Sequence, residues 1–85
     1  MARQIFIEKA NYMNDYTVQL NFNDGVIRII DFGYFLKTRP HPQHSKYLKY
    51  SNFRKFRIYG GNIVWGKNRD LEFDLYPLYQ GKNPR

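Results

Sequence analysis

A chain of 85 residues has room for one domain with a single modest core, and its 19% aromatic residues supply the apolar area to build one. The absence of cysteine excludes disulfides, thiolate zinc ligands and a cysteine nucleophile, and it indicates a reducing, cytoplasmic compartment. The formal net charge is +7, and the densest apolar run, residues 26–30, is interrupted by Arg28, so we expect a basic protein with no membrane span and no export signal.

The first predicted elements form a three-stranded antiparallel meander. Residues 16–22 alternate strictly between apolar and polar side chains, which is typical of a strand with one buried face. The turn residues 23–25 lead into the β-branched residues 26–30, and this pattern predicts a hairpin. Upstream, the apolar residues 5–8 are predicted to form a short strand that reaches the hairpin through a turn at residues 11–15.

The middle of the chain is predicted to be a loop followed by one short helix. Prolines push the residue before them out of helical geometry, so Pro40 and Pro42 favour a loop over residues 32–43. Ser45 can cap a helix with a ragged apolar side, and residues 51–52 are expected to end it after about two turns.

A second hairpin follows the short helix. Residues 56–59 and 62–65 are rich in aromatic and β-branched side chains, which favour strands. The two glycines between them, Gly60 and Gly61, accept the positive φ angles of a two-residue turn. Trp65 closes this hairpin and is expected to anchor the core.

The last predicted element is a short C-terminal helical turn. After a turn at residues 66–68, Asp70 can cap a helical turn that Pro77 limits. Its apolar residues are Leu71, Leu75 and Tyr76. The predicted fold class is therefore α+β, in a single domain over residues 1–80 with a frayed tail at residues 81–85.

The spacing of several residues resembles a bacterial protein family. These residues are Leu20, Phe22, Asp24, Gly25, Asp31, Phe53, Trp65, Asp70 with Leu71, and Leu75 with Tyr76. The pattern covers most of the chain and is similar to the domain-of-unknown-function family 2442. The resemblance implies a small α+β fold with a meander, a short helix and a second hairpin. It also implies a protein-binding or regulatory module without catalytic residues, because such proteins are often linked to toxin–antitoxin-type gene pairs or fused to helix-turn-helix domains.

The positive charge is concentrated in the middle of the chain. Residues 1–31 carry three bases against four acids, and residues 70–85 carry two bases against three acids. Residues 32–69 carry nine bases and no acid, so this stretch should create a local positive field. The nine bases are Lys37, Arg39, Lys46, Lys49, Arg54, Lys55, Arg57, Lys67 and Arg69.

Within this stretch, residues 37–57 form a basic aromatic segment that is the predicted binding site. Its candidate residues for an acidic partner or a nucleic acid are Lys46, Tyr47, Lys49, Tyr50, Arg54, Lys55 and Arg57. Cations can neutralise phosphates and exposed rings can stack on bases, which suits single-stranded nucleic acid. Alternatively, Phe53, Phe56 and Leu48 belong to the core and the cations cover the outer face. A basic face also binds acidic proteins, so charge alone does not choose the partner.

The other polar clusters favour structural roles. His41 and His44 are three residues apart, but no third metal ligand lies nearby in the sequence, and we expect no metal and no cofactor. Asp70, Glu72 and Asp74 fit helix capping and a solvated face better than a catalytic pair. No serine has a nucleophile context and the paired glycines lack a phosphate-loop lysine, so the sequence predicts no enzyme.

Three functions remain open from the sequence. The first is a non-enzymatic interaction module, the partner-binding, antitoxin-like member of a toxin–antitoxin-type pair. Its partner would be a toxin-like protein, or a second copy of the chain added at an open sheet edge. The second is binding of RNA or single-stranded DNA through residues 37–57. The third is a small basic ribonuclease that uses His41 or His44 as acid or base.

Overall fold

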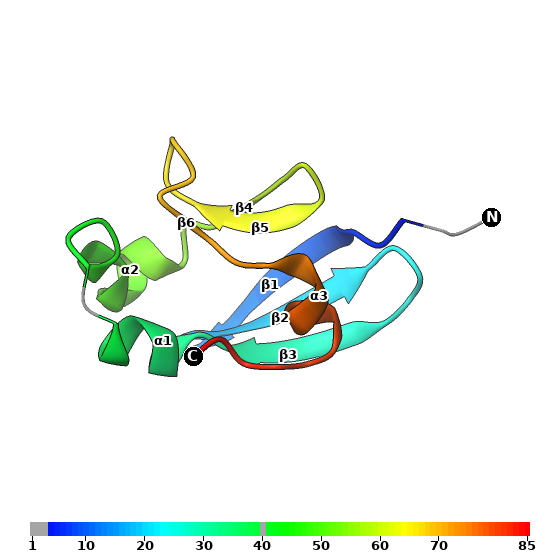
Figure 1. Cartoon of the computed structure of the whole chain (residues 1–85), viewed down its shortest axis with the longest axis horizontal. Coiled ribbons are helices and arrows are strands. Elements are labelled where there is room, and N and C mark those ends of the chain that lie inside the picture. The colour runs from blue at the N-terminus through cyan, green and yellow to red at the C-terminus, as the bar shows by residue number, and fades with distance from the viewer. Residues whose placement is uncertain (1–3, 40) are drawn as a thin grey trace.

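Two small antiparallel sheets joined by short helices make up the structure (Figure 1). This computed structural model describes residues 4–39 and 41–85, so the prediction at Pro40 and the first three residues of the predicted domain lie outside it. The predicted α+β class with a β-meander is confirmed. The elements are β1 (Ile7–Asn14), β2 (Thr17–Phe22), β3 (Ile27–Asp31), α1 (Gly33–Thr38), η1 (Ser45–Leu48), α2 (Tyr50–Phe53), β4 (Arg57–Tyr59), β5 (Asn62–Trp65), β6 (Leu71–Glu72) and α3 (Leu75–Tyr79).

The first sheet has the order β1-β2-β3 and follows the alternation of its central strand. The apolar residues predicted to share one face are all buried: Tyr16, Val18, Leu20 and Phe22. Strand β1 is longer than predicted, because residues 11–14 pair with β2 and do not form a turn. The turn is confined to residues 15–16, where Asp15 adopts a φ of 44°, a conformation that aspartate tolerates better than most residues.

The predicted loop over residues 32–43 is wrong for its first half, which contains helix α1. The backbone N–H of Gly33 donates to Asp31 Oδ1 over 2.7 Å, and Leu36 is buried against the core. Arg39, the residue before Pro40, has left helical geometry with a φ of −124° and a ψ of 72°. A proline restricts only the residue before it, which here is Arg39. Helix α1 can therefore form over the preceding residues and end at Thr38.

The single predicted helix after Ser45 is split into η1 and α2. Lys49 is extended between them, with a φ of −82° and a ψ of 123°. Ser45 is not the cap, because its Oγ donates to the carbonyl of His41 over 2.9 Å. Residues 51–52 lie inside α2 and do not end it. The Nδ2 of Asn52 instead donates to the carbonyl of Lys46 over 2.9 Å, which ties the two helical pieces together.

The second sheet has the order β4-β5-β6 and contains the predicted hairpin. Gly60 and Gly61 form its turn with φ angles of 59° and 82°, as expected from the sequence. The predicted C-terminal helical turn is confirmed at Leu75 and Tyr76, which lie in α3, but it does not begin at Asp70, because Leu71 belongs to β6 and pairs with Trp65. The last helix, α3, begins after Asp74.

Helix α3 contains Pro77, which was predicted to limit a helix. Pro77 is the third residue of α3, where a backbone N–H has no partner within the helix, so the missing donor costs little. After α3 the chain runs beside β3 (Figure 1), where Asn83 Oδ1 accepts a hydrogen bond from the backbone N–H of Asp31 over 3.0 Å. No helix in the described ranges is long and apolar enough to cross a membrane.

The core lies where the two sheets and the helices meet. Trp65 is fully buried, and its ring packs on Phe32 and Phe53 at centroid distances of 5.1 and 5.4 Å. Its Nε1–H donates to the carbonyl of Phe53 over 2.7 Å, so the tryptophan is the predicted core anchor. The sheets are also joined through their backbones, since the N–H of Ile7 in β1 donates to the carbonyl of Gly61 over 2.7 Å.

Candidate partner-binding face

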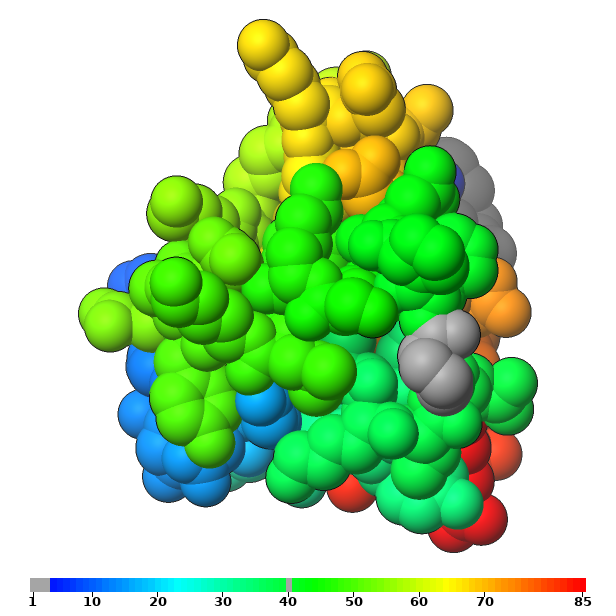
Figure 2. Space-filling model, turned by 90° about the vertical axis from the view of Figure 1, so that its left-hand side faces the viewer, coloured from blue at the N-terminus to red at the C-terminus, as the bar shows by residue number. Residues whose placement is uncertain are grey.

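Four of the seven predicted site residues surround one shallow hollow of about 310 Å³. Lys46 and Tyr47 come from η1, Lys55 follows α2, and Arg57 begins β4. Asn52, Gly66 and Lys67 complete the lining. Figure 2 shows the side of the molecule on which the helical segments (green) meet the loop after β5 (yellow). The fold thus brings four cations, Lys46, Lys55, Arg57 and Lys67, around one hollow.

Arg57 is held in place on the wall of the hollow. Its Nη2 donates to the carbonyls of Gly66 and Lys67, each over 3.2 Å, and its guanidinium lies 5.3 Å from the ring centre of Tyr59. A guanidinium has five N–H donors, and within the described ranges only those on Nη2 are bonded, so the groups on Nε and Nη1 can serve a ligand. These contacts restrict the rotamers of Arg57, so a ligand bound through it would cost less side-chain entropy.

Lys46 is oriented by Asp70, which the sequence places far away in the chain. Lys46 Nζ lies 3.2 Å from Asp70 Oδ2 and 5.3 Å from the ring centre of Tyr47. The hydrogen bond to Asp70 raises the pKa of Lys46, so the amine remains a cation at neutral pH. Asp70 therefore positions Lys46, and its single negative charge offsets only one of the four positive charges around the hollow.

Gly66 lines the hollow at a position that only glycine fits. Its φ of +88° is rarely adopted by other residues. A Cβ at this position would lie 2.5 Å from Asp70 Oδ2 and 2.8 Å from the Tyr47 hydroxyl oxygen. The backbone of the loop can therefore approach the Lys46–Asp70 pair closely, and this approach gives the hollow its shape.

The three remaining predicted residues lie outside the hollow. The guanidinium of Arg54 lies 5.0 Å from the ring centre of Tyr12 in β1, and the ring of Tyr50 lies 5.0 Å from that of Tyr16. Lys49 sits at the break between η1 and α2 and does not line the hollow. The predicted segment therefore divides into a hollow and a separate basic aromatic surface beside the turn between β1 and β2.

Most rings of the basic aromatic segment point inward. Tyr47 is only 4% exposed, Phe53 is fully buried and Phe56 packs against the core. Tyr50 remains 48% exposed, and the negative charge of Asp15 raises its pKa. Leu48, which was grouped with the core residues, is partly exposed. The interleaving of bases and rings therefore does not create a row of exposed rings on which successive bases could stack.

Three residues of the hollow were absent from the predicted site: Asn52, Gly66 and Lys67. Gly66 was assigned only to a turn at residues 66–68. Lys67 was counted only in the acid-free stretch, and its place after the turn glycine Gly66 was the available signal. Asn52 was interpreted as a helix end, although an amide side chain in that place can also bond to a preceding carbonyl. The place of Lys67 depends on the loop at residues 66–69 lying against η1, and that of Asn52 on the contact between α2 and η1, and the linear sequence reveals neither.

His44 is part of the packing, and the exposed ring of His41 lies beside it. Their ring centres lie 4.7 Å apart, and His44 Nε2 lies 3.1 Å from the carbonyl oxygen of Asp70, to which it donates. The Nδ1 of His44 is buried and has no hydrogen-bond partner among residues 4–39 and 41–85, and the His44 ring packs on Phe35. Among the described residues, no group of three His, Cys, Asp or Glu side chains could hold a metal ion. His44 therefore fastens η1 to the segment that precedes β6.

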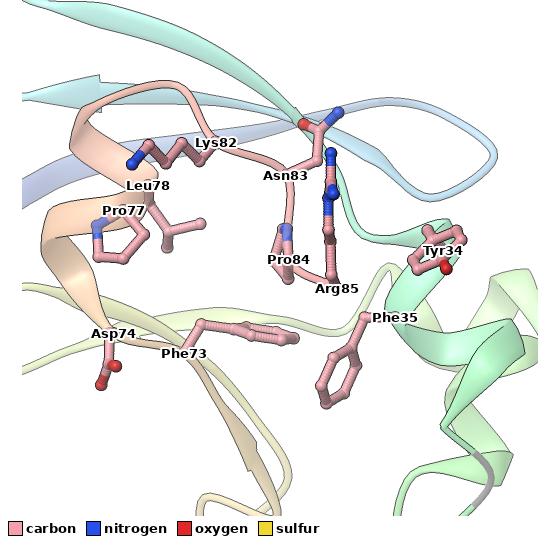
Figure 3. Close-up of a pocket in the computed structure, with 10 residues that line it drawn as sticks. All are labelled: Tyr34, Phe35, Phe73, Asp74, Pro77, Leu78, Lys82, Asn83, Pro84 and Arg85. Atoms are coloured by element: carbon pink, nitrogen blue, oxygen red, sulfur yellow. The ribbon is translucent and has the colours of Figure 1, made fainter.

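A second, larger hollow of about 1070 Å³ lies between α1, α3 and the C-terminal residues. Figure 3 shows that the rings of Phe73 and Phe35 lie below Pro84 and Arg85. The remaining lining is mixed in polarity: Tyr34, Asp74, Pro77, Leu78, Lys82 and Asn83. This groove has an aromatic wall, whereas the hollow at Arg57 is distinguished by its cations.

These features define a small α+β domain made of a meander, three short helices and a second three-stranded sheet. A family model matches residues 7–84, and the chain belongs to that family, described as a protein of unknown function (DUF2442). The family resemblance inferred from the sequence is thereby confirmed. No curated protein and no solved structure matches the chain. Two residues carry the resemblance and have structural roles here: Trp65 anchors the core, and Asp70 orients Lys46.

Proposed function

We propose that this chain is a non-catalytic interaction module that binds an acidic surface of a protein partner, as the antitoxin-like member of a toxin–antitoxin-type pair. The convergence of Lys46, Lys55, Arg57 and Lys67 around one hollow carries this proposal. The cations come from separate segments of the chain, so folding gathers more positive charge around the hollow than any one of these segments carries there. The cysteine-free composition suits such a partnership in the cytoplasm.

The charge distribution supports an acidic partner. Residues 32–69 contain no acid, and Asp70 is the acid that contacts the hollow through Lys46. A surface with this imbalance attracts a complementary negative patch and raises the rate of encounter. The ordered Arg57 and Lys46 then fix the register of the docked partner, whereas the exposed Lys55 and Lys67 add affinity at the rim.

Binding of RNA or single-stranded DNA is the second candidate. It is favoured by the separate surface on which Arg54 lies over Tyr12 and Tyr50 stays half exposed. The inward orientation of Tyr47 and Phe53 weakens it, because stacking on successive bases needs successive exposed rings. A protein partner is therefore the better supported of the two.

The test is a pull-down with the tagged full chain from a lysate of the organism that encodes it, split into nuclease-treated and untreated halves. A protein recovered in stoichiometric amount from both halves is expected. The variant Lys55→Glu/Lys67→Glu should lose this protein, whereas Lys9→Glu/Lys82→Glu, which changes the net charge equally, should retain it.

Two results would overturn the proposal. Recovery of nucleic acid, with every captured protein lost after nuclease treatment, would replace it with the second candidate. Capture of the same protein by the wild-type chain and by the Lys55→Glu/Lys67→Glu variant would show that the partner docks on another surface.

A further inference from the structure

We propose that the hollow is a carboxylate-binding site that seats an aspartate or glutamate side chain from an acidic segment of the partner. This inference rests on the proposed function and specifies the chemistry of its contact. The hollow, at about 310 Å³, has room for one such side chain and not for a folded element.

The fixed donors of the site are Arg57 and Lys46. Two N–H groups of Arg57 are used by the carbonyls of Gly66 and Lys67, and these bonds direct the rest of the guanidinium. Lys46 has three N–H donors, of which one points to Asp70. Hydrogen bonds from a cation to a carboxylate are roughly twice as strong as neutral ones, so two ordered cations suffice to hold one acidic side chain.

The adaptable donors of the site are Lys55 and Lys67. Within the described part of the chain, no ion pair or ring contact holds either amine. Both side chains are exposed at the rim of the hollow, where they can meet acidic residues that flank the seated one. The preferred ligand is therefore a run of acids and not an isolated carboxylate.

A ligand must carry enough negative charge to compete with Asp70 for Lys46. Asp70 already neutralises part of the charge of Lys46 and holds its amine beside the hollow. An incoming carboxylate must compete with this internal one, so a single weak acid binds poorly and several acids in sequence bind cooperatively. The chemistry that the site recognises is thus an acidic peptide.

The proposal can be tested with synthetic peptides and the full chain. The probes are a capped hexapeptide of glutamate, a matched hexapeptide of glutamine and a single-stranded oligonucleotide of equal charge, titrated by calorimetry at low and moderate salt. The glutamate peptide is expected to bind, the glutamine peptide to show no binding, and the affinity to fall as salt increases.

Matched variants locate the site. Lys55→Gln/Lys67→Gln is expected to weaken binding of the glutamate peptide about tenfold, whereas Lys9→Gln/Lys82→Gln, with the same loss of charge, should change it less than about twofold. Arg57→Lys keeps the charge but loses the fixed geometry, and should weaken binding several-fold. Thermal unfolding midpoints of all variants show that each is folded during the titration.

Three outcomes would overturn the site. These are equal weakening by the two double variants, equal binding of the two peptides, and tighter binding of the oligonucleotide that the Lys55→Gln/Lys67→Gln variant abolishes. None of these depends on a host partner. A protein partner captured by the pull-down while the peptide fails would leave the interaction module standing and remove only its carboxylate site.

Discussion

Gly66 connects the conformation of one residue to the shape of the hollow. Its backbone carbonyl accepts from Arg57, and its missing side chain leaves space for the carboxylate of Asp70 and the hydroxyl of Tyr47. Gly25 has a similar φ, +91°, but a Cβ there would meet nothing within 4 Å. Substituting alanine at each position therefore distinguishes the cost of backbone strain, present at both, from the cost of a steric clash, present only at Gly66.

We predict that Gly66→Ala lowers the free energy of unfolding by about 2–4 kcal/mol, from strain at positive φ and overlap with Asp70 and Tyr47. Gly25→Ala should cost only the strain, about 1–2 kcal/mol. Urea unfolding of both variants measures the difference. Equal losses would mean that the close approach at Gly66 does not restrict the side chain.

Trp65 offers a second test at the residue scale. Replacing it with phenylalanine removes the hydrogen bond to the carbonyl of Phe53 and leaves a buried acceptor and a small cavity. We expect a loss of about 2–4 kcal/mol in the free energy of unfolding. Tyr76→Phe, at a side chain that is 65% exposed, is the control and should leave stability unchanged. A similar stability for both variants would contradict the anchoring role of Trp65.

At the scale of elements, β3 has two adjacent isoleucines on opposite faces of the sheet. Ile30 is fully buried and pairs with Val18, whereas Ile29 is 56% exposed and pairs with Gln19. Ile30→Lys is expected to unfold the domain, because it buries an unpaired charge. Ile29→Lys should change stability by less than about 0.5 kcal/mol. Circular dichroism and thermal unfolding distinguish the two, and an unfolded Ile29→Lys variant would exclude this register.

The elements that the sequence predicts well are those set by local patterns. The alternation at residues 16–22 and the paired glycines Gly60 and Gly61 specify strands and a turn without reference to the rest of the chain. Helix α1 was missed because the prolines that follow it were interpreted as breaking the whole segment, whereas they restrict only the residue before each. Strand β6 was missed because its pairing with Trp65 is a tertiary contact.

The candidate site was also predictable only where it depends on local sequence. The acid-free stretch predicted where the charge lies, because charge is a property of composition. Which cations converge depends on the loop at residues 66–69 lying against η1, and this placement follows from the contacts of Asp70 with Lys46 and His44. Sequence periodicity contains no information about such a contact, so Lys67 and Asn52 were found only in the folded chain.

At the scale of the whole molecule, four groups hold their protons more tightly in the folded state. Burial raises the pKa of Tyr16, and the hydrogen bond to Asp70 raises that of Lys46. The charge of Asp15 raises the pKa of Tyr50, and the hydrogen bond to Asp24 raises that of Tyr79. A raised pKa contributes stability that is complete below the unfolded value, ~10 for these groups, and is lost as the pH rises through the folded value.

We therefore predict that the free energy of unfolding is level across neutral pH and falls above about pH 10. Urea unfolding at a series of pH values measures this dependence. Tyr79→Phe removes one of these titrating groups and should make the alkaline decline shallower, whereas Tyr34→Phe, at an exposed ring on α1, serves as the matched control. Stability that increases above pH 10 would contradict the prediction.

The hydrogen bond between Ile7 and Gly61 also bears on how the chain folds during synthesis. The meander can pair as soon as residues 7–31 have left the ribosome, since its contacts are close in sequence. The amide of Ile7 then has no backbone acceptor until the second hairpin has emerged and presented Gly61. The nascent chain therefore holds an incomplete domain between the emergence of residue 31 and that of the second hairpin, and β1 completes its backbone bonding only when Gly61 is in place.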